Sequence, residues 1–212
     1  MRGSGAGVAA DRRRLAITAG HRREPAVARE ALGDADPAVR AAALGALARS
    51  GALTVAVVRR CLADPSPVVR RRACEVSATW RGTGTATLRS SLRAAAEDAD
   101  PLVAESACWA LGEHADRRAT GLLARLATGH PDARCRESAV AALGAIGDPA
   151  GLPAVLACLA DRPAVRRRAA VALAAFAAPE ADEALRRCLE DRDWQVREVA
   201  EILLAGETLL EG

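Results

Sequence analysis

The sequence is poor in aromatic residues and contains no lysine. Of its 212 residues three are tryptophan, one is phenylalanine and none is tyrosine, and all 30 basic residues are arginine. The apolar half of the chain is therefore mainly alanine, leucine and valine, which suits closely packed helices better than a β-sheet. With so much alanine, the exclusive use of arginine is typical of GC-biased codon usage, so we give arginine abundance no functional weight.

Several function classes lack their signatures in this chain. No apolar run approaches the roughly 20 residues of a membrane span, and residues 1–10 lack the hydrophobic core of a secretory signal. We therefore predict a cytoplasmic protein without membrane contact. No Gly-x-Ser-x-Gly elbow, phosphate-binding loop or Gly-x-Gly-x-x-Gly turn is present, so the sequence predicts neither an enzyme nor a cofactor.

One motif recurs six times along the chain, at a spacing of 30 to 34 residues. Each copy is counted from an anchor position, which is occupied by Arg40, Arg70, Ala104, Arg136, Arg166 and Arg197. A valine or cysteine precedes each anchor, an alanine follows three places later, and a leucine follows seven places later in five of the six copies. A fixed period of this size predicts a stacked repeat array, in which each unit buries its apolar face against its neighbours.

The anchors lie in predicted helices whose starts can be read from the sequence. Four places before the anchor most copies carry aspartate or serine, which cap a helix N-terminus, and four copies continue with proline. The predicted caps are Asp36, Ser66, Asp100, Asp132 and Asp193. In the fifth copy Arg162 stands at this place, and the neighbouring Asp161 is the candidate substitute.

A second apolar-periodic segment follows each anchor helix after a short turn, so the sequence predicts a string of helix pairs. The predicted helices cover residues 37–49, 53–63, 67–79, 85–97, 101–112, 117–128, 132–146, 150–160, 163–176, 180–190 and 193–205. We expect an all-α, right-handed α-solenoid of about six pairs, forming a single domain over residues 11–205. A degenerate N-terminal pair at 11–20 and 24–32 caps it, and Arg12, Arg13 and Arg14 form its solvated face. Residues 1–10 are predicted to be flexible, and residues 206–212 to form a frayed tail or half a helix.

The six cysteines occupy hydrophobic positions of the repeat. Cys74 and Cys108 share the slot four places after the anchor, where other copies carry leucine or valine, and Cys158 and Cys188 share another slot. Cysteine in such slots acts as a small apolar residue. No Cys-x-x-Cys pair is present. We therefore predict buried free thiols, without disulfides or a zinc site.

The repeated motif resembles the HEAT repeat. The resemblance rests on Asp-x-x-Val-Arg with proline at the helix start, on the alanine and leucine that follow, and on the preceding Gly147-Asp148-Pro149-Ala150-Gly151-Leu152. The short spacing is most similar to the bilin-lyase-type subfamily, and the resemblance covers about residues 24–205. It implies that the anchor helices line a concave side and that their Asp and Arg side chains form a ladder, interrupted at Ala104. The implied structural residues are Asp36, Arg40, Asp100, Asp132, Arg136, Arg166, Asp193 and Arg197.

Two activities found among HEAT-like proteins can be compared with these residues. Iron-dependent HEAT hydroxylases use repeated His-Glu pairs, but this chain has no His-Glu dipeptide, and His21, His114 and His130 fall in different repeat slots. We therefore predict no metal site, and we interpret the three histidines as turn and surface residues. Bilin-lyase-like binding of a tetrapyrrole and its acceptor protein stays open as an alternative, because fold likeness does not separate it from scaffolding.

Nucleic-acid binding is the other alternative. The cations available on the exposed side of the anchor helices are Arg71, Arg72, Arg134, Arg167 and Arg168, and Trp109 could stack on a base. Acidic residues share this surface and would repel phosphates: Glu75, Glu105, Glu137 and Glu198. The net charge of +3, with both signs interspersed, also differs from the strong cationic face of a general nucleic-acid binder.

The remaining interpretation is a scaffold that binds another protein on its concave inner-helix surface, although the same stripe could be only a solvated face. Solenoids present such surfaces, whose exposed side chains can change without touching the core. The candidate partner-binding residues are Arg71, Arg72, Glu75, Glu105, Trp109, Glu113, Arg134, Glu137, Arg167 and Arg168. Trp109 is the most distinctive of them, because the helical period places it away from the buried stripe, between Glu105 and Glu113.

Overall fold

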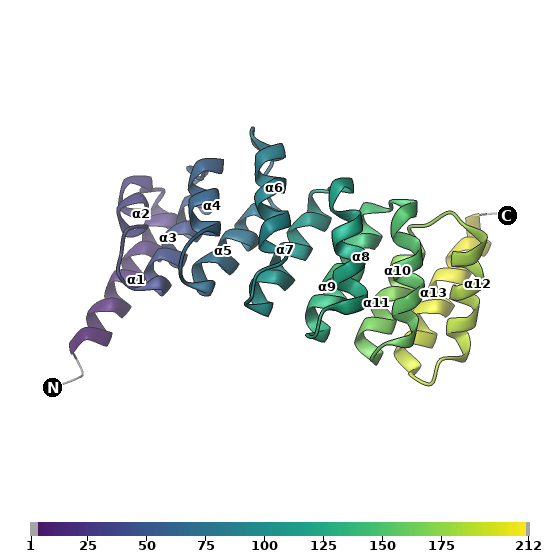
Figure 1. The fold of residues 1–212 in the computed structure, drawn as a ribbon. Helices are drawn as coiled ribbons and strands as arrows, with labels where there is room; N and C mark the ends of the chain where they lie inside the picture. Colours follow the sequence, from purple (N-terminus) through teal and green to yellow (C-terminus); the bar gives the residue numbers. More distant parts are fainter. Residues whose placement is uncertain (1–3, 211–212) are drawn as a thin grey trace. The chain divides into compact units, whose positions relative to one another are not determined.

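A computed structural model describes the backbone of residues 4–210 and the side chains of residues 7–205 (Figure 1). Within that range the regular structure is helical throughout, with no strand. The chain is an all-α solenoid of paired helices, as the repeat predicts. The helix that carries the anchor in each pair is called the A helix here, and the helix that follows it is the B helix.

Contacts divide the chain into two compact units, Met1–Ala107 and Cys108–Gly212. The single repeat domain over residues 11–205 stays a prediction. The helices of the first unit are α1 (Ser4–Arg22), α2 (Pro25–Ala31), α3 (Pro37–Arg49), α4 (Val55–Leu62), α5 (Pro67–Ala78) and α6 (Thr85–Ala95). Helix α7 (Pro101–Glu113) runs across the boundary. The α-helices of the second unit are α8 (Thr120–Gly129), α9 (Ala133–Ile146), α10 (Leu152–Ala157), α11 (Pro163–Leu173), α12 (Pro179–Arg187) and α13 (Trp194–Leu210).

Both ends of the helical region differ from the prediction. Helix α1 begins at Ser4, before the expected start at Asp11, and α13 continues to Leu210 instead of ending at residue 205. Short 3-10 turns extend the B helices of the second unit. They are η1 (Arg117–Ala119), η2 (Pro149–Gly151), η3 (Cys158–Ala160) and η4 (Cys188–Glu190).

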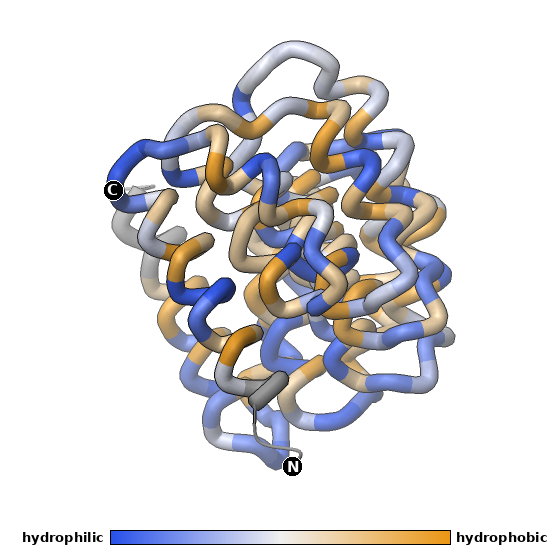
Figure 2. Tube along the Cα trace, turned by 90° about the vertical axis from the view of Figure 1, so that its left-hand side faces the viewer, coloured by the Kyte–Doolittle hydropathy of each residue, from blue (hydrophilic) through white to orange (hydrophobic). Residues whose placement is uncertain are grey.

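The helices form two layers within each unit. A helices pack on A helices, as α3 does on α5 and α9 does on α11, and B helices pack on B helices, as α4 does on α6 and α8 does on α10. Helix α1 takes the place of an A helix beside α3. Hydrophobic and hydrophilic segments alternate along the helices (Figure 2), because each helix buries one stripe and exposes the other.

The slot three places after the anchor lies on the buried face of each A helix. All six alanines of this slot are fully buried: Ala43, Ala73, Ala107, Ala139, Ala169 and Ala200. A methyl side chain fits this buried position, and a larger one would overfill it. The predicted register of the anchor helices is therefore confirmed.

The cysteines are buried free thiols, as predicted. Burial raises the pKa of the Cys74 thiol to about 12 and that of the Cys158 thiol to about 11. A thiol with such a pKa stays protonated at neutral pH, so neither residue supplies a reactive thiolate.

The predicted arginine ladder exists, but its acceptor is a different aspartate. Arg40 does not pair with Asp36; its Nε and Nη2 donate to the Asp64 carboxylate at 2.9 and 2.7 Å, in the loop before the next A helix. Its Nη1 donates to the carbonyls of Asp34 and Ala35. The same bidentate contact recurs as Arg70–Asp98, Arg136–Asp161 and Arg166–Asp191. Each rung thus ties one repeat to the next.

The ladder pattern is missing in the middle of the chain at two positions. Ala104 replaces the arginine, as the sequence indicates, and His130 stands where most other copies carry the acceptor aspartate. His130 Nδ1 keeps one function of that aspartate, because it accepts the backbone N–H of Asp132 at 3.1 Å, as Asp98 Oδ1 accepts that of Asp100.

Most of the predicted helix caps are confirmed. The side chains of Asp36, Asp100, Asp132 and Asp193 each accept a backbone N–H of the first helical turn. Two predictions are wrong. The Ser66 side chain makes no capping hydrogen bond, and α11 has no side-chain cap, since the Asp161 carboxylate is bound by Arg136 and by the backbone N–H of Arg162.

The structure contradicts one prediction for a polar residue, that of His114, and confirms another, that of Arg12. His114 was expected at the surface but is buried. Arg12 is exposed, as predicted, and its Nε also donates to Asp34 at 2.7 Å, so it forms the first rung of the ladder. Over the described part of the chain, no helix is long and apolar enough to cross a membrane.

Candidate functional site

The predicted binding residues divide between the two units. Arg71, Arg72, Glu75 and Glu105 belong to the first, and the other six belong to the second. All ten are exposed or half-buried. Trp109 keeps 43% of its surface exposed, which confirms that it points away from the buried stripe. The candidate residues of each unit are therefore described separately.

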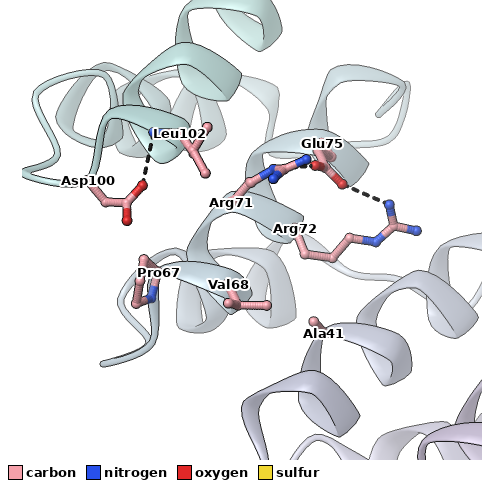
Figure 3. A pocket seen from close by; sticks show the side chains of 8 residues that line it. All are labelled: Ala41, Pro67, Val68, Arg71, Arg72, Glu75, Asp100 and Leu102. Carbon is pink, nitrogen blue, oxygen red and sulfur yellow. Dashed lines mark hydrogen bonds and ion pairs between the residues drawn. The ribbon is translucent and has the colours of Figure 1, made fainter. Parts of the chain in front are cut away.

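The first unit has a groove between α3, α5 and the start of α7, with a volume of about 260 Å³ (Figure 3). Its lining residues are Ala41, Pro67, Val68, Arg71, Arg72, Glu75, Asp100 and Leu102. Glu75 lies between two arginines, accepting from Arg71 Nε and from Arg72 Nη1 at 2.9 Å each. One carboxylate is thus shared by two guanidinium groups.

A second depression, of about 370 Å³, adjoins this groove and shares Ala41, Val68 and Arg72 with it. It adds side chains from α1 and α3: Arg13, Ile17, Ala38, Ala42 and Arg49. None of Arg13, Ile17 and Arg49 was among the predicted binding residues; for the two on α1 the reason is that this helix was interpreted as a cap and not as part of the A-helix layer. The available signal was the four-residue spacing of Arg13 and Ile17, which places them on one helix face.

Arg72 lies directly against the backbone of α3. A Cβ atom on Gly45 would come within 2.5 Å of Arg72 Nη2 and 3.1 Å of its Nε, so the guanidinium occupies the space that a larger residue would fill. Gly45 is itself buried, although it stands in the slot that holds the exposed Trp109 in α7. Because Gly45 has no side chain, the Arg72 guanidinium can lie close to the backbone of α3.

The groove of the second unit is apolar. It lies between α9 and α11, has a volume of about 360 Å³, and is lined by Ala141, Gly144, Ala145, Arg168, Val171, Ala172, Ala174 and Ala175. The charged candidates around it bind polar partners of the protein itself. Arg168 Nη2 donates to Glu137 at 3.2 Å, Arg134 pairs with Asp132 at 2.8 Å, and Arg167 donates to Gln195.

The described residues contain no group of three or more His, Cys, Asp or Glu side chains that could hold a metal ion. The six cysteines, which could otherwise act as nucleophiles, are buried. What the two surfaces offer is a set of exposed apolar side chains beside arginines and glutamates. Mixed surfaces of this kind suit molecular recognition.

Family comparisons agree with the repeat pattern. Residues 88–163 match the family of HEAT repeats, and residues 165–191 match the PBS lyase HEAT-like repeat. No significant match was found among curated proteins.

Solved structures with a similar fold include both enzymes and binding proteins. A chain of the CpcE–CpcF complex of phycocyanin lyase from Nostoc sp. PCC7120 is 25% identical, with a TM-score of 0.63 over 83% of this chain and 74% of that one. A designed armadillo repeat protein in complex with the peptide (KR)4 is 17% identical, with a TM-score of 0.64 over 85% of this chain and 98% of that one. Human deoxyhypusine hydroxylase is 23% identical, with a TM-score of 0.50 over 92% of this chain and 78% of that one.

Proposed function

Because the chain is a HEAT-repeat protein with repeats of the PBS lyase type, we propose that it is a non-catalytic scaffold that binds another protein through the exposed surface of its A helices. The observation that carries this proposal is the exposure of large apolar side chains on that surface. Val68 is 53% exposed, Trp109 43% and Val171 44%. Val68 and Val171 each line a groove, and exposed apolar side chains beside a concave site are typical of binding surfaces.

Two of the similar structures support this use of the fold. The phycocyanin lyase chain was solved as a complex of CpcE with CpcF, and the designed armadillo protein was solved with a bound peptide. In both cases a repeat protein of comparable size holds a second polypeptide. The charged residues of the A-helix surface would then set specificity, while the apolar residues supply most of the affinity.

The test compares capture of proteins from the native cell extract by matched variants. Val68→Asp and Val171→Asp place a charge on the A-helix surfaces of the two units. Ala56→Asp on α4 and Gly121→Asp on α8 place the same charge at exposed B-helix positions. We expect one of the A-helix variants to lose the proteins that wild type captures, as quantified by mass spectrometry, while both B-helix variants keep them. Equal capture by all four variants would exclude the A-helix surface as the binding site.

A lyase-type function is the second candidate. It is favoured by the PBS lyase HEAT-like match over residues 165–191 and by the similarity to the phycocyanin lyase chain. Incubation with a bilin tetrapyrrole, followed by gel filtration, tests it directly. A stoichiometric visible absorption band that elutes with the protein would favour the lyase role over the scaffold, and elution of the protein without the band would exclude tetrapyrrole binding by this chain alone.

A further inference from the structure

We propose that the joined grooves of the first unit bind an acidic segment of the partner protein, anchored by an apolar side chain over Val68. This inference rests on the proposed scaffold function and specifies the partner for one of its two surfaces. The cationic groove is defined as the two depressions on either side of Val68 and Arg72, formed by α1, α3, α5 and the start of α7.

The lining of the cationic groove contains twice as many arginines as carboxylates. Four arginines line it, namely Arg13, Arg49, Arg71 and Arg72, and the acidic lining residues are Glu75 and Asp100. Glu75 is shared by two of the arginines, and Asp100 Oδ1 accepts the backbone N–H groups of Leu102 and Val103 at the start of α7. A carboxylate-bearing segment would therefore meet an excess of guanidinium groups, which bind carboxylates well.

The apolar side chains of the groove lie among these cations. Val68 is 53% exposed and lines both depressions, Ile17 is 37% exposed, and Leu102 is half-buried. The Arg72 guanidinium lies against α3 beside Gly45, and Val68 stays exposed between the two depressions. A leucine or similar side chain of the partner would cover Val68, while acidic neighbours reach the arginines on either side.

The same features disfavour other occupants. None of the residues that line the two depressions is aromatic, so the groove offers no stacking platform for bases. Four arginines are also few for nucleic-acid binding, whose affinity depends on the number of phosphate contacts. A basic peptide such as the (KR)4 held by the designed armadillo protein has the wrong charge for this surface.

The test uses a fluorescein-labelled peptide with three copies of Gly-Glu-Glu-Leu, titrated with the full chain and followed by fluorescence anisotropy. Three probes serve for comparison. Two are peptides, one with Lys in place of Glu and one with Ser in place of Leu, and the third is an oligothymidylate of similar length. We expect the acidic-apolar peptide to bind at least about ten-fold more tightly than each of the others, and its affinity to fall as salt is added. Tighter binding of the oligothymidylate would assign the groove to nucleic acid instead, and no binding of the acidic peptide would overturn the proposal.

Matched variants locate the binding. Arg72→Gln and Val68→Ser should each weaken binding of the acidic-apolar peptide about ten-fold. Arg187→Gln is the control, because Arg187 also pairs with a glutamate, Glu183, but lies on the B helix α12 of the second unit, outside both grooves. It should leave the dissociation constant unchanged. Circular dichroism and thermal unfolding confirm that all three variants are folded; equal binding by folded Arg72→Gln and wild type would contradict the proposal.

The two proposals can fail separately. If the peptide does not bind but Val68→Asp or Val171→Asp still loses the native partners, the acidic-segment inference is wrong and the scaffold function stands. If no A-helix variant affects native capture, the scaffold proposal fails whatever the peptide does.

Discussion

Arg136 holds Asp161 with two parallel hydrogen bonds, from Nε to Oδ2 at 2.6 Å and from Nη2 to Oδ1 at 2.8 Å. The two residues are 25 positions apart and belong to successive repeats. Arg136 Nη1 also donates to the carbonyls of His130 and Pro131. A single side chain thus joins the loop that starts its own helix to the loop that starts the next one, and this relationship makes neighbouring repeats depend on each other for stability.

We expect Arg136→Ala to lower the free energy of unfolding by about 2–3 kcal/mol, because it removes charge-assisted hydrogen bonds and leaves the half-buried Asp161 carboxylate without its cation. Arg134→Ala is the control. Arg134 is two positions away, its side chain is 57% exposed, and its ion pair with Asp132 lies at the surface, so its loss should cost less than about 1 kcal/mol. Urea denaturation of both variants measures the difference. A similar midpoint for the two would show that the ladder adds nothing to stability.

The ladder also predicts an acid-sensitive fold. The hydrogen bond from Arg70 lowers the pKa of Asp98 below its usual value of 3.8, so this carboxylate binds a proton less readily in the folded than in the unfolded state. Its stabilising contribution is therefore complete above the unfolded pKa and disappears as the pH falls through the lower folded pKa. We expect the free energy of unfolding of wild type to fall between pH 5 and about pH 3, and Asp98→Asn to fall less steeply over the same range. Parallel pH profiles would contradict this role for Asp98.

Gly144 allows α9 and α11 to approach closely. A Cβ atom at this position would lie 2.8 Å from Ala172 Cβ and 2.9 Å from Ala172 Cα, so the backbone of one helix would have to move. We expect Gly144→Ala to destabilise the protein by about 1–3 kcal/mol. Gly121→Ala on α8 should have the opposite sign, with a gain of about 0.5–1 kcal/mol, because nothing lies within 4 Å of its Cβ and alanine favours helix. Thermal unfolding of the two variants separates the effect of steric packing from that of helix propensity. Destabilisation by both would show that the close approach at Gly144 is not the cause.

Local signals in the sequence were sufficient for the fold. Short-range rules determine the burial of the alanine slot and the caps at Asp36 or Asp132, and six copies of the same pattern allow each position to be checked against the others. The aspartates that accept the hydrogen bonds of the ladder could not be identified from the sequence. Asp64 and Asp98 both stand six places before their anchors, but only the reach of an arginine side chain into the next repeat shows that they, and not the caps, bind the cations.

The candidate site was predictable only in part, since it depends on how helices from different repeats meet. The repeat slots identify Arg71 and Arg72 as exposed. They do not show that Glu75 is shared by both, or that Gly45 makes room for one of them. Arg13 is exposed, as predicted, but its place beside a depression was not foreseen, because helix α1 lacks the motif that would identify it as a neighbour of α3. These contacts depend on the packing of helices from different repeats, which cannot be read from the sequence of a single repeat.

Trp109 is the strongest candidate for an affinity-determining residue in the second unit. It occupies the slot that holds the exposed Val171 and Ile202 in later copies, and it is the largest side chain there. Tryptophan buries a large area with few rotatable bonds, and for this reason it is frequent among binding hot spots. We expect Trp109→Ala to keep the unfolding free energy close to that of wild type, while binding of a partner identified by native capture weakens by about 2 kcal/mol or more. Trp194→Ala is the control, because Trp194 is 60% exposed but stands at the start of α13, outside this slot. If Trp109→Ala unfolds, or binds the partner as tightly as Trp194→Ala does, Trp109 is a packing residue of the solenoid and the second unit must recognise its partner elsewhere.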